Sequence, residues 1–160
     1  MTCRTALAVI AVGLWASASN AWAQDEGQAL LGAHNARRDR HCVPAMTWSA
    51  DIAAAARQWA EGCSMSHSQG SGYGENLAWG GGLTGAMAVD MWYNEASGYD
   101  YNAPGFSIST GHFTQVIWRG STELGCGWAD CNGQTFMVCR YAPPGNYEGE
   151  FPANVPQACK

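Results

Sequence analysis

The chain has 160 residues, with 8 Lys and Arg against 13 Asp and Glu, and its formal net charge is −5. A single lysine and an acidic balance argue against a nucleic-acid-binding protein, because binding to phosphates needs a concentrated basic surface. The length suits one domain with a hydrophobic core of its own.

The beginning of the chain has the three-part layout of a secretory leader. Arg4 precedes an apolar run over residues 6–16, and small residues follow it. We therefore expect a signal peptide over residues 1–23, cleavage before Gln24 and a mature domain over residues 24–160. The alternative is a membrane anchor, but the run is shorter than the roughly 20 residues that cross a bilayer, and we expect no transmembrane segment. The expected location is secreted and extracellular, or periplasmic if the source is bacterial.

Seven cysteines occur, and six remain once the leader with Cys3 is removed. An even set of cysteines in an exported chain predicts a disulfide framework, because an oxidising compartment favours bridges over free thiols. A zinc ribbon is the alternative, but the chain has no C-x-x-C pair. The six cysteines are Cys42, Cys63, Cys126, Cys131, Cys139 and Cys159.

Three helices are predicted in the first part of the mature chain. Residues 25–40 repeat apolar positions at helical spacing, and they end in a basic cluster that includes Arg38, as the helix dipole favours. Ser49 and Thr84 are predicted N-caps of two further helices. The stripes expected to be buried are Ile52, Ala56, Trp59, Ala60 and Cys63 in the first of these, and Met87, Ala88, Met91, Trp92 and Glu95 in the second.

A β-hairpin is predicted in the last part of the chain. Residues 124–128 and 135–141 have the composition of strands, and residues 130–133 form the turn between them. Helices first and antiparallel strands late indicate an α+β domain in which helices pack on a sheet.

Three stretches carry the signature of a known family: residues 74–80 (GENLAWG), 111–118 (GHFTQVIW) and 138–147 (VCRYAPPGNY). On these stretches the chain resembles the CAP superfamily of cysteine-rich secretory proteins, antigen five proteins and plant pathogenesis-related proteins. The resemblance covers nearly the whole mature chain. It implies a single-domain, disulfide-stapled α-β-α sandwich with an antiparallel sheet between helices, and a short helix over residues 114–118.

The resemblance also implies a disulfide pairing. Plant-type members often carry an extra cysteine pair just before the second signature, and residues 106–110 of this chain contain none. The family's pairing, carried over residue by residue, implies Cys63–Cys131 and Cys126–Cys139, and it leaves Cys42–Cys159.

Four residues match the conserved cleft of the family: His67, Glu75, Glu95 and His112. Two neutral imidazoles can supply nitrogen ligands to Zn²⁺ or another divalent cation, and two carboxylates can fix the ring tautomers or bind a water. The resemblance thus implies a metal site at the two histidines, supported by the two glutamates. The alternatives are ion pairs that only tie loops together, or a metal-assisted hydrolase of the protease or esterase type in which a glutamate is the general base. No catalytic residue is assigned.

Tyr99, Tyr101 and Phe106 resemble the aromatic loop with which fungal CAP proteins hold sterols. An exposed aromatic loop would bind a sterol or another small lipid by apolar burial, and tyrosine hydroxyls could meet the single polar group of a sterol. The alternative is an ordinary loop whose aromatic rings fold back onto the domain. We therefore expect a secreted binding protein for a sterol or small lipid, with a secreted defence or toxin effector as a further alternative. The sequence identifies no protein partner.

Overall fold

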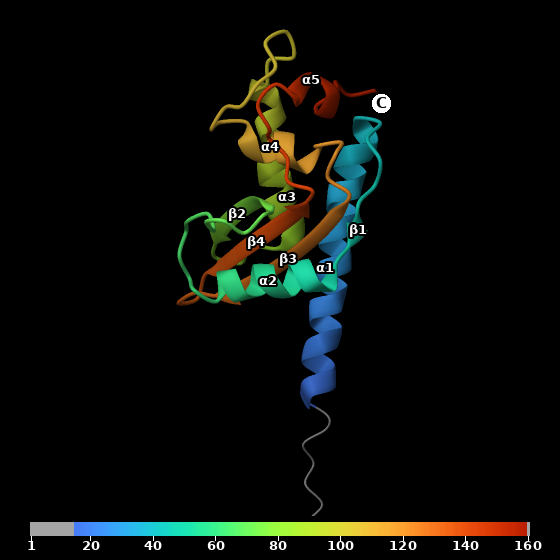
Figure 1. The fold of residues 1–160 in the computed structure, drawn as a ribbon. Coiled ribbons are helices and arrows are strands. Elements are labelled where there is room, and N and C mark those ends of the chain that lie inside the picture. The colour runs from blue at the N-terminus through green and yellow to red at the C-terminus, as the bar shows by residue number, and fades with distance from the viewer. Residues whose placement is uncertain (1–14, 160) are drawn as a thin grey trace, which may run out of the picture.

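The computed structural model describes the backbone of residues 15–159 and the side chains of residues 26–159. Most of the expected signal peptide lies outside the described residues, so the leader stays a prediction. Over the described part, the chain folds into a sheet held between two layers of helices (Figure 1). The three-layer α-β-α sandwich implied by the family resemblance is confirmed.

A four-stranded sheet with the strand order β1-β3-β4-β2 forms the middle layer. The strands are β1 (Thr47–Trp48), β2 (Gly74–Gly80), β3 (Glu123–Asp130) and β4 (Thr135–Ala142). β2, β3 and β4 pair antiparallel, whereas the two residues of β1 pair parallel with β3. The predicted hairpin is confirmed as β3 and β4. β2 was not predicted as a strand, because its glycines and asparagine have low strand propensity.

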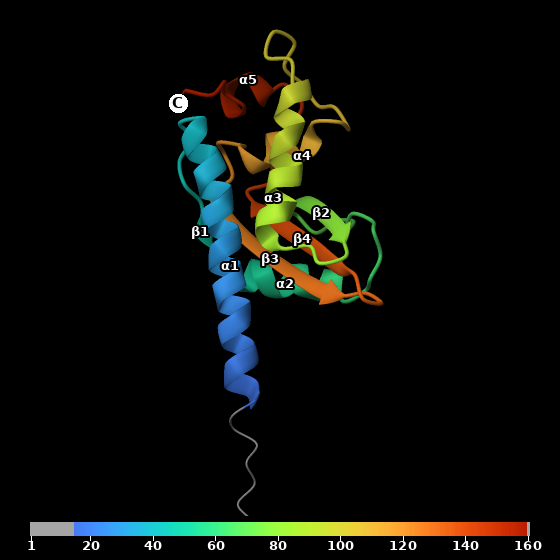
Figure 2. The same ribbon diagram turned by 180° about the vertical axis from the view of Figure 1, so that it is seen from behind.

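Helices cover both faces of the sheet. They are α1 (Trp15–Arg40), α2 (Ala50–Ala60), α3 (Gly85–Asn94), the 3-10 helix η1 (Glu95–Gly98), α4 (Gly111–Val116) and α5 (Phe151–Asn154). α2 lies on one face, and α1 and α3 lie side by side on the other (Figures 1 and 2). None of these helices is, over the described residues, long and apolar enough to cross a bilayer.

The alternation of side chains along β4 divides the core into two clusters. Phe136 and Val138 face α2 and belong to the smaller cluster. Met137, Cys139 and Tyr141 face the opposite way and join the larger cluster, to which α1, α3 and α4 contribute. The sheet is therefore buried on both faces over its central strands, as a three-layer sandwich requires.

Three disulfides staple the domain. They are Cys63–Cys131, Cys126–Cys139 and Cys42–Cys159, the same pairs that the resemblance implied. The first holds the loop after α2 to the β3–β4 turn, and the second joins directly opposed residues of the hairpin. The third ties the segment after α1 to the C-terminal segment across 117 positions of sequence.

Both predicted N-caps are confirmed. The Ser49 hydroxyl accepts a hydrogen bond from the Ile52 amide at 3.4 Å, and the Thr84 hydroxyl accepts one from the Met87 amide at 3.3 Å. Each cap satisfies an amide of the first helical turn that has no partner within the helix.

The stripe predicted for α3 is partly wrong. Met87 and Met91 are 50% and 53% exposed, and the buried residues are Ala88, Val89 and Trp92. The start of α3 lies so close to α1 that a side chain at Gly85 would collide with Leu30. This contact turns the helix so that both methionines face outward.

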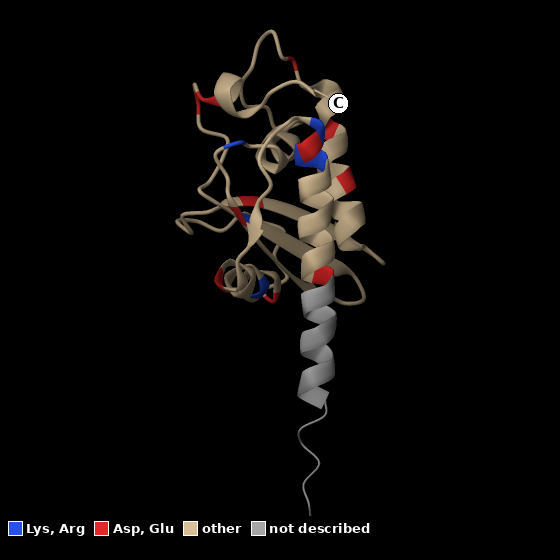
Figure 3. Ribbon diagram, turned by 90° about the vertical axis from the view of Figure 1, so that its right-hand side faces the viewer, with Lys and Arg blue, Asp and Glu red and all other residues tan. Residues whose placement is uncertain are grey.

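The basic cluster predicted at the end of α1 is present, but its arginines differ in their surroundings. Figure 3 shows basic and acidic residues alternating at this end of the helix. Arg37 forms an ion pair with Asp90 of α3. Arg38, in contrast, is fully buried and donates hydrogen bonds to backbone carbonyls from distant segments. The charged group of Arg38 therefore interacts with backbone carbonyls in the interior and not with solvent.

Two glycines of β3 allow α2 to lie directly on the sheet. A Cβ atom on Gly125 would collide with the backbone of Ala53, and one on Gly127 would collide with the backbone of Arg57. A helix backbone cannot move aside as a flexible side chain can, so these positions set the distance between α2 and the sheet.

We expect Gly125→Ala to lower the free energy of unfolding by about 2 kcal/mol or more, since the added methyl must push α2 away from β3. Urea denaturation followed by circular dichroism measures the change. Gly81→Ala is the matched control, because no atom lies within 4 Å of its added methyl. Equal midpoints for the two variants would contradict this account of the α2 contact.

Candidate functional site

Four hydrogen bonds converge on the carboxylate of Glu75 at the start of β2. Its Oε1 accepts from His67 Nδ1 at 3.0 Å and from the Ser68 amide at 2.9 Å. Its Oε2 accepts from the Ser68 hydroxyl at 2.7 Å and from Arg140 Nε at 3.0 Å. The Glu75 side chain is 5% exposed and that of His67 is 56% exposed. This arrangement fixes the loop after α2 onto the edge of the sheet and holds the His67 ring at the surface.

The environment of Glu75 keeps its carboxylate ionised. Burial by itself would raise the pKa of Glu75, but the hydrogen bonds from His67, Ser68 and Arg140 outweigh it and lower the pKa to about 2. A carboxylate with so low a pKa is a weak general base at neutral pH. Glu75 is therefore suited to anchoring and orienting its neighbours, and poorly suited to the general-base role in the hydrolase alternative.

The second pair is formed by Glu95 and His112. Glu95 Oε1 accepts from His112 Nδ1 at 2.7 Å, while Oε2 accepts from the backbone amides of His112 and Phe113 at 3.0 and 3.2 Å. Those amides belong to the first turn of α4, where they have no partner within the helix. One carboxylate thus caps α4 and orients the imidazole. The His112 ring also stacks on Trp92, with 6.4 Å between the ring centroids.

Both pairs present the same chemistry. In each, the carboxylate faces Nδ1 of the imidazole, so a neutral ring that donates its Nδ1 proton keeps an unprotonated Nε2. This is how carboxylates orient histidines toward metals in proteins. Within residues 26–159, however, no three side chains of His, Cys, Asp or Glu gather in a way that could hold a metal ion. The glutamates act here as hydrogen-bond acceptors for the rings.

The two pairs reach β2 from its two faces. Glu75 lies on the α2 side, where its partner Arg140 also donates to the carbonyl of Ala55 at 3.1 Å. The next residue, Asn76, points to the opposite side, where its amide donates to the carbonyl of His112 at 3.1 Å. The structure therefore brings each histidine to one glutamate, and strand alternation links the two pairs through adjacent residues.

A buried chain of hydrogen bonds supports His112 from behind. Asn76 donates to the His112 carbonyl and to the Tyr141 hydroxyl, both at 3.1 Å. His34 Nδ1 donates to the Leu30 carbonyl at 2.8 Å, so its Nε2 accepts from the Tyr141 hydroxyl at 2.9 Å. Burial lowers the pKa of His34 to about 4, which keeps this ring neutral. Each side chain in this hydrogen-bond network has its partners, so the network holds the backbone at His112 in place.

Sequence reasoning missed several of these supporting residues. Arg140, Asn76 and Tyr141 contact the site residues or their backbone, yet none was named as a candidate. All three lie within the signature stretches over residues 74–80 and 138–147, and that was the only signal available. Their roles depend on cross-strand register, which places Glu75 opposite Arg140.

The aromatic residues of the segment between η1 and α4 differ in exposure. Tyr99 is 8% exposed and packs on Phe113, with 5.7 Å between ring centroids, and on Tyr101, with 4.9 Å. Tyr99 therefore belongs to the core and offers little surface to a ligand. Phe106 is 55% exposed, and Ile108, which was not predicted, is 89% exposed. The apolar surface of this segment thus comes from Phe106 and Ile108, with a partial contribution from Tyr101.

Comparison with known proteins agrees with this architecture. Residues 31–141 match the model of the CAP family, described as the cysteine-rich secretory protein family. The pathogenesis-related protein PR-1 type of Sambucus nigra is 46% identical over 141 residues, which cover 81% of this chain and 83% of that protein. Protein PRY2 of Saccharomyces cerevisiae is 46% identical over 138 residues, which cover 82% of this chain and 41% of PRY2.

Solved structures show the same fold. The structure of NaASP2 with Zn²⁺ has a TM-score of 0.69 at 22% identity, and the match covers 85% of this chain and 87% of that chain. Na-ASP-1 has a TM-score of 0.67 at 27% identity, covering 79% of this chain and 40% of its own. The fold and the paired His–Glu residues define a disulfide-bonded α-β-α domain. The chain belongs to the CAP family.

We expect Glu75→Gln to weaken the dependence of stability on pH in acid. Because the pKa of Glu75 is lowered from 4.5 to about 2 by folding, its contribution is present above pH 4.5 and is lost as the pH falls toward 2. Melting temperatures measured at several pH values should show a smaller fall over this window in the variant, and a lower value at pH 7.

The matched control is Glu61→Gln, since Glu61 forms an exposed pair with Arg57 at 3.1 Å. Exposed pairs contribute little to stability, so this variant should follow the unmodified protein. If Glu75→Gln and Glu61→Gln gave the same pH profile, the hydrogen bonds to Glu75 would not be the source of its lowered pKa.

Proposed function

We propose that this CAP-family protein is an extracellular binding protein that takes a sterol or another small lipid at the segment between η1 and α4. The observation that carries the proposal is the exposure of two large apolar side chains close together on this segment, Phe106 at 55% and Ile108 at 89%. Adjacent exposed apolar groups of this kind favour a binding role. Residues 101–111 contain no charged side chain, so no buried charge would oppose contact with a lipid.

The rings beneath this surface support the proposal. Tyr99 contacts Tyr101 and Phe113 edge to face, which gives the segment a packed aromatic base. A lipid ring placed against Phe106 would bury apolar area, and each Å² of buried apolar area would stabilise the complex by roughly 25 cal/mol. Binding would cost little ordering entropy, because the aromatic base is already in place.

An extracellular location has separate support. The expected leader and the three disulfides both favour export, since structural disulfides persist in oxidising compartments. Plant relatives are named pathogenesis-related proteins, which favours a defence role in which the protein acts by sequestering a lipid.

We also propose that His67 and His112 each offer Nε2 as a ligand to a divalent cation, for which Zn²⁺ is the natural probe. The support is the shared orientation of the two rings, each with Nδ1 on a carboxylate and Nε2 left for a ligand. One solved structure of similar fold is that of NaASP2 with Zn²⁺. When bound, such an ion supplies a Lewis acid, and Glu75 and Glu95 would hold the ring tautomers that coordination needs.

We expect Phe106→Ala to weaken the binding of a fluorescent sterol by about four- to tenfold, because only the exposed half of the ring remains to be buried. Fluorescence titration measures the dissociation constant. Met87→Ala is the matched control, since Met87 is 50% exposed in the first turn of α3, at the end of the helix opposite η1. His112→Ala should also leave sterol affinity unchanged. If Phe106→Ala left sterol affinity unchanged while a folded His112→Ala variant lost binding, the lipid would instead bind at the His–Glu pairs.

We expect Zn²⁺ to raise the melting temperature at pH 7.5, because a ligand that binds only the native state stabilises it. Protons compete with the metal for imidazole nitrogens, so the shift should fade below about pH 6. Scanning fluorimetry with Zn²⁺, with Mg²⁺ and with a chelator measures the effect. The double variant His67→Ala/His112→Ala should lose the shift. An unchanged shift in this variant would show that the ion binds elsewhere.

A further inference from the structure

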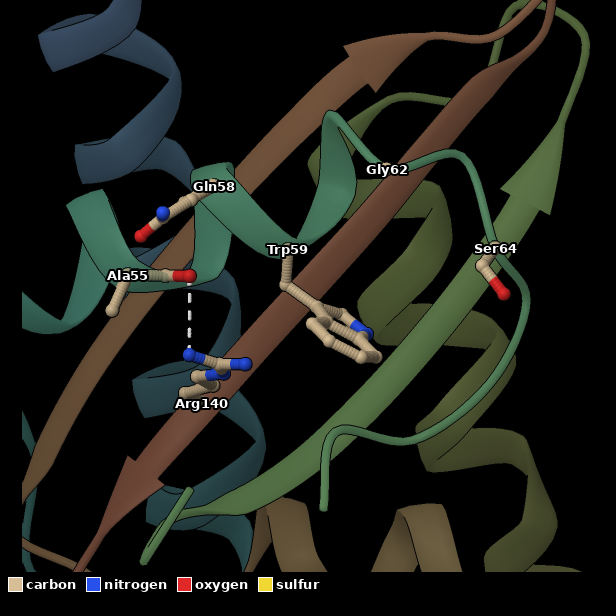
Figure 4. A pocket seen from close by; sticks show the side chains of 6 residues that line it. All are labelled: Ala55, Gln58, Trp59, Gly62, Ser64 and Arg140. Atoms are coloured by element: carbon tan, nitrogen blue, oxygen red, sulfur yellow. Dashed lines mark hydrogen bonds between the residues drawn. The ribbon is translucent and has the colours of Figure 1, made fainter. Parts of the chain in front are cut away.

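A cavity of about 390 Å³ lies on the α2 face of the domain, between α2, the loop that follows it and β4. Six residues line it: Ala55, Gln58, Trp59, Gly62, Ser64 and Arg140 (Figure 4). This volume falls within the range of sites for small molecules. The cavity is distinct from the segment between η1 and α4, which joins helices on the opposite face of the sheet.

Trp59 forms an apolar wall of fixed orientation. Its indole Nε1 donates to the carbonyl of Ser66 at 2.9 Å, and the ring packs against the smaller core cluster. The disulfide Cys63–Cys131 anchors the loop that carries the acceptor. Two of the lining residues, Ala55 and Gly62, are small, so they leave room beside the ring. A ligand would therefore meet a preformed aromatic surface.

Arg140 places hydrogen-bond donors at the floor of the cavity. Its Nε donates to Glu75 at 3.0 Å, and one terminal nitrogen donates to the Ala55 carbonyl at 3.1 Å. Figure 4 shows the other terminal nitrogen directed toward Trp59. Gln58 and Ser64 add an amide and a hydroxyl, groups that can both donate and accept.

The charge of the site selects a neutral ligand. The buried ion pair with Glu75 already balances the charge of the Arg140 guanidinium. An anionic ligand in the cavity would therefore be repelled by the Glu75 carboxylate. Arg57 of α2 is likewise paired with Glu61. The site therefore calls for an uncharged molecule with an oxygen acceptor for Arg140 and an apolar face for Trp59.

We infer that this cavity binds a neutral saccharide, with one pyranose ring against Trp59 and its hydroxyls at Arg140, Gln58 and Ser64. The C–H hydrogens on the face of a pyranose carry partial positive charge and suit the negative face of an indole. Each sugar hydroxyl can both donate and accept, which suits the Gln58 amide and the Ser64 hydroxyl, whereas a peptide presents its N–H donors and C=O acceptors as separate groups. The volume suits a short saccharide and not a long chain.

The test is an NMR titration of the ¹⁵N-labelled protein, which follows the indole N–H signal of Trp59. Trp59→Phe assigns this signal by its disappearance. The probes are cellobiose, maltose and N,N′-diacetylchitobiose, each at millimolar concentration. We expect at least one of them to shift the Trp59 signal in a saturable way. Gln58→Ala should raise the dissociation constant about three- to tenfold, because it removes hydrogen bonds to the sugar.

Gln28→Ala is the matched control, since Gln28 is an exposed glutamine on α1 and lies outside the cavity. It should leave the titration unchanged, and circular dichroism should show both variants folded, as expected for exposed helical positions. The inference is overturned if no disaccharide shifts the Trp59 signal, or if Gln58→Ala and Gln28→Ala bind alike. A shift caused by a blocked dipeptide but by no sugar would also overturn it and would identify a peptide site.

Discussion

The buried guanidinium of Arg38 is the interaction on which the arrangement of the functional segments depends. It donates to the carbonyl oxygens of Val116, Trp118 and Ser121, and to that of Pro44, at distances from 2.8 to 3.1 Å. Desolvation lowers the pKa of Arg38 to about 10, so the group is still charged at neutral pH. A buried charge must be satisfied, and these carbonyls can satisfy it only from fixed positions. Arg38 thereby ties the end of α1 to the end of α4 and to the connection that leads into β3.

The position of α4 in turn sets the geometry around His112. Glu95 can cap α4 and orient His112 only because α3 ends next to the first turn of α4. On the other side of β2, Arg140 performs a similar task for Glu75 and thus for His67. Both histidines are oriented by carboxylates that the fold itself holds, and the proposed binding of a cation rests on this preorganisation.

The sandwich also keeps its proposed binding surfaces apart. Figure 1 shows α2 at one end of the domain and the segment after η1 at the other. The lipid surface depends on exposed apolar groups among residues 101–111, which carry no charged side chain. The cavity beside Trp59 instead combines an aromatic wall with polar groups and a balanced ion pair. Two surfaces of such different chemistry on one small domain can act independently, so occupation of one need not affect the other.

Local signals in the sequence were sufficient to predict the helices capped by Ser49 and Thr84, the hairpin and the family. Caps, turns and signature stretches each involve only a few consecutive residues, so they can be recognised without the tertiary structure. They also identified the four His and Glu residues, though not how these pair. Tertiary structure alone decided that Arg38 is buried, that Met87 and Met91 face outward, and that Tyr99 belongs to the core. Spacing shows which residues share one side of a helix or strand, but the side that is buried depends on which neighbour packs against it. That choice is made by contacts between residues far apart in the chain, such as Leu30 with Gly85 and Arg140 with Glu75.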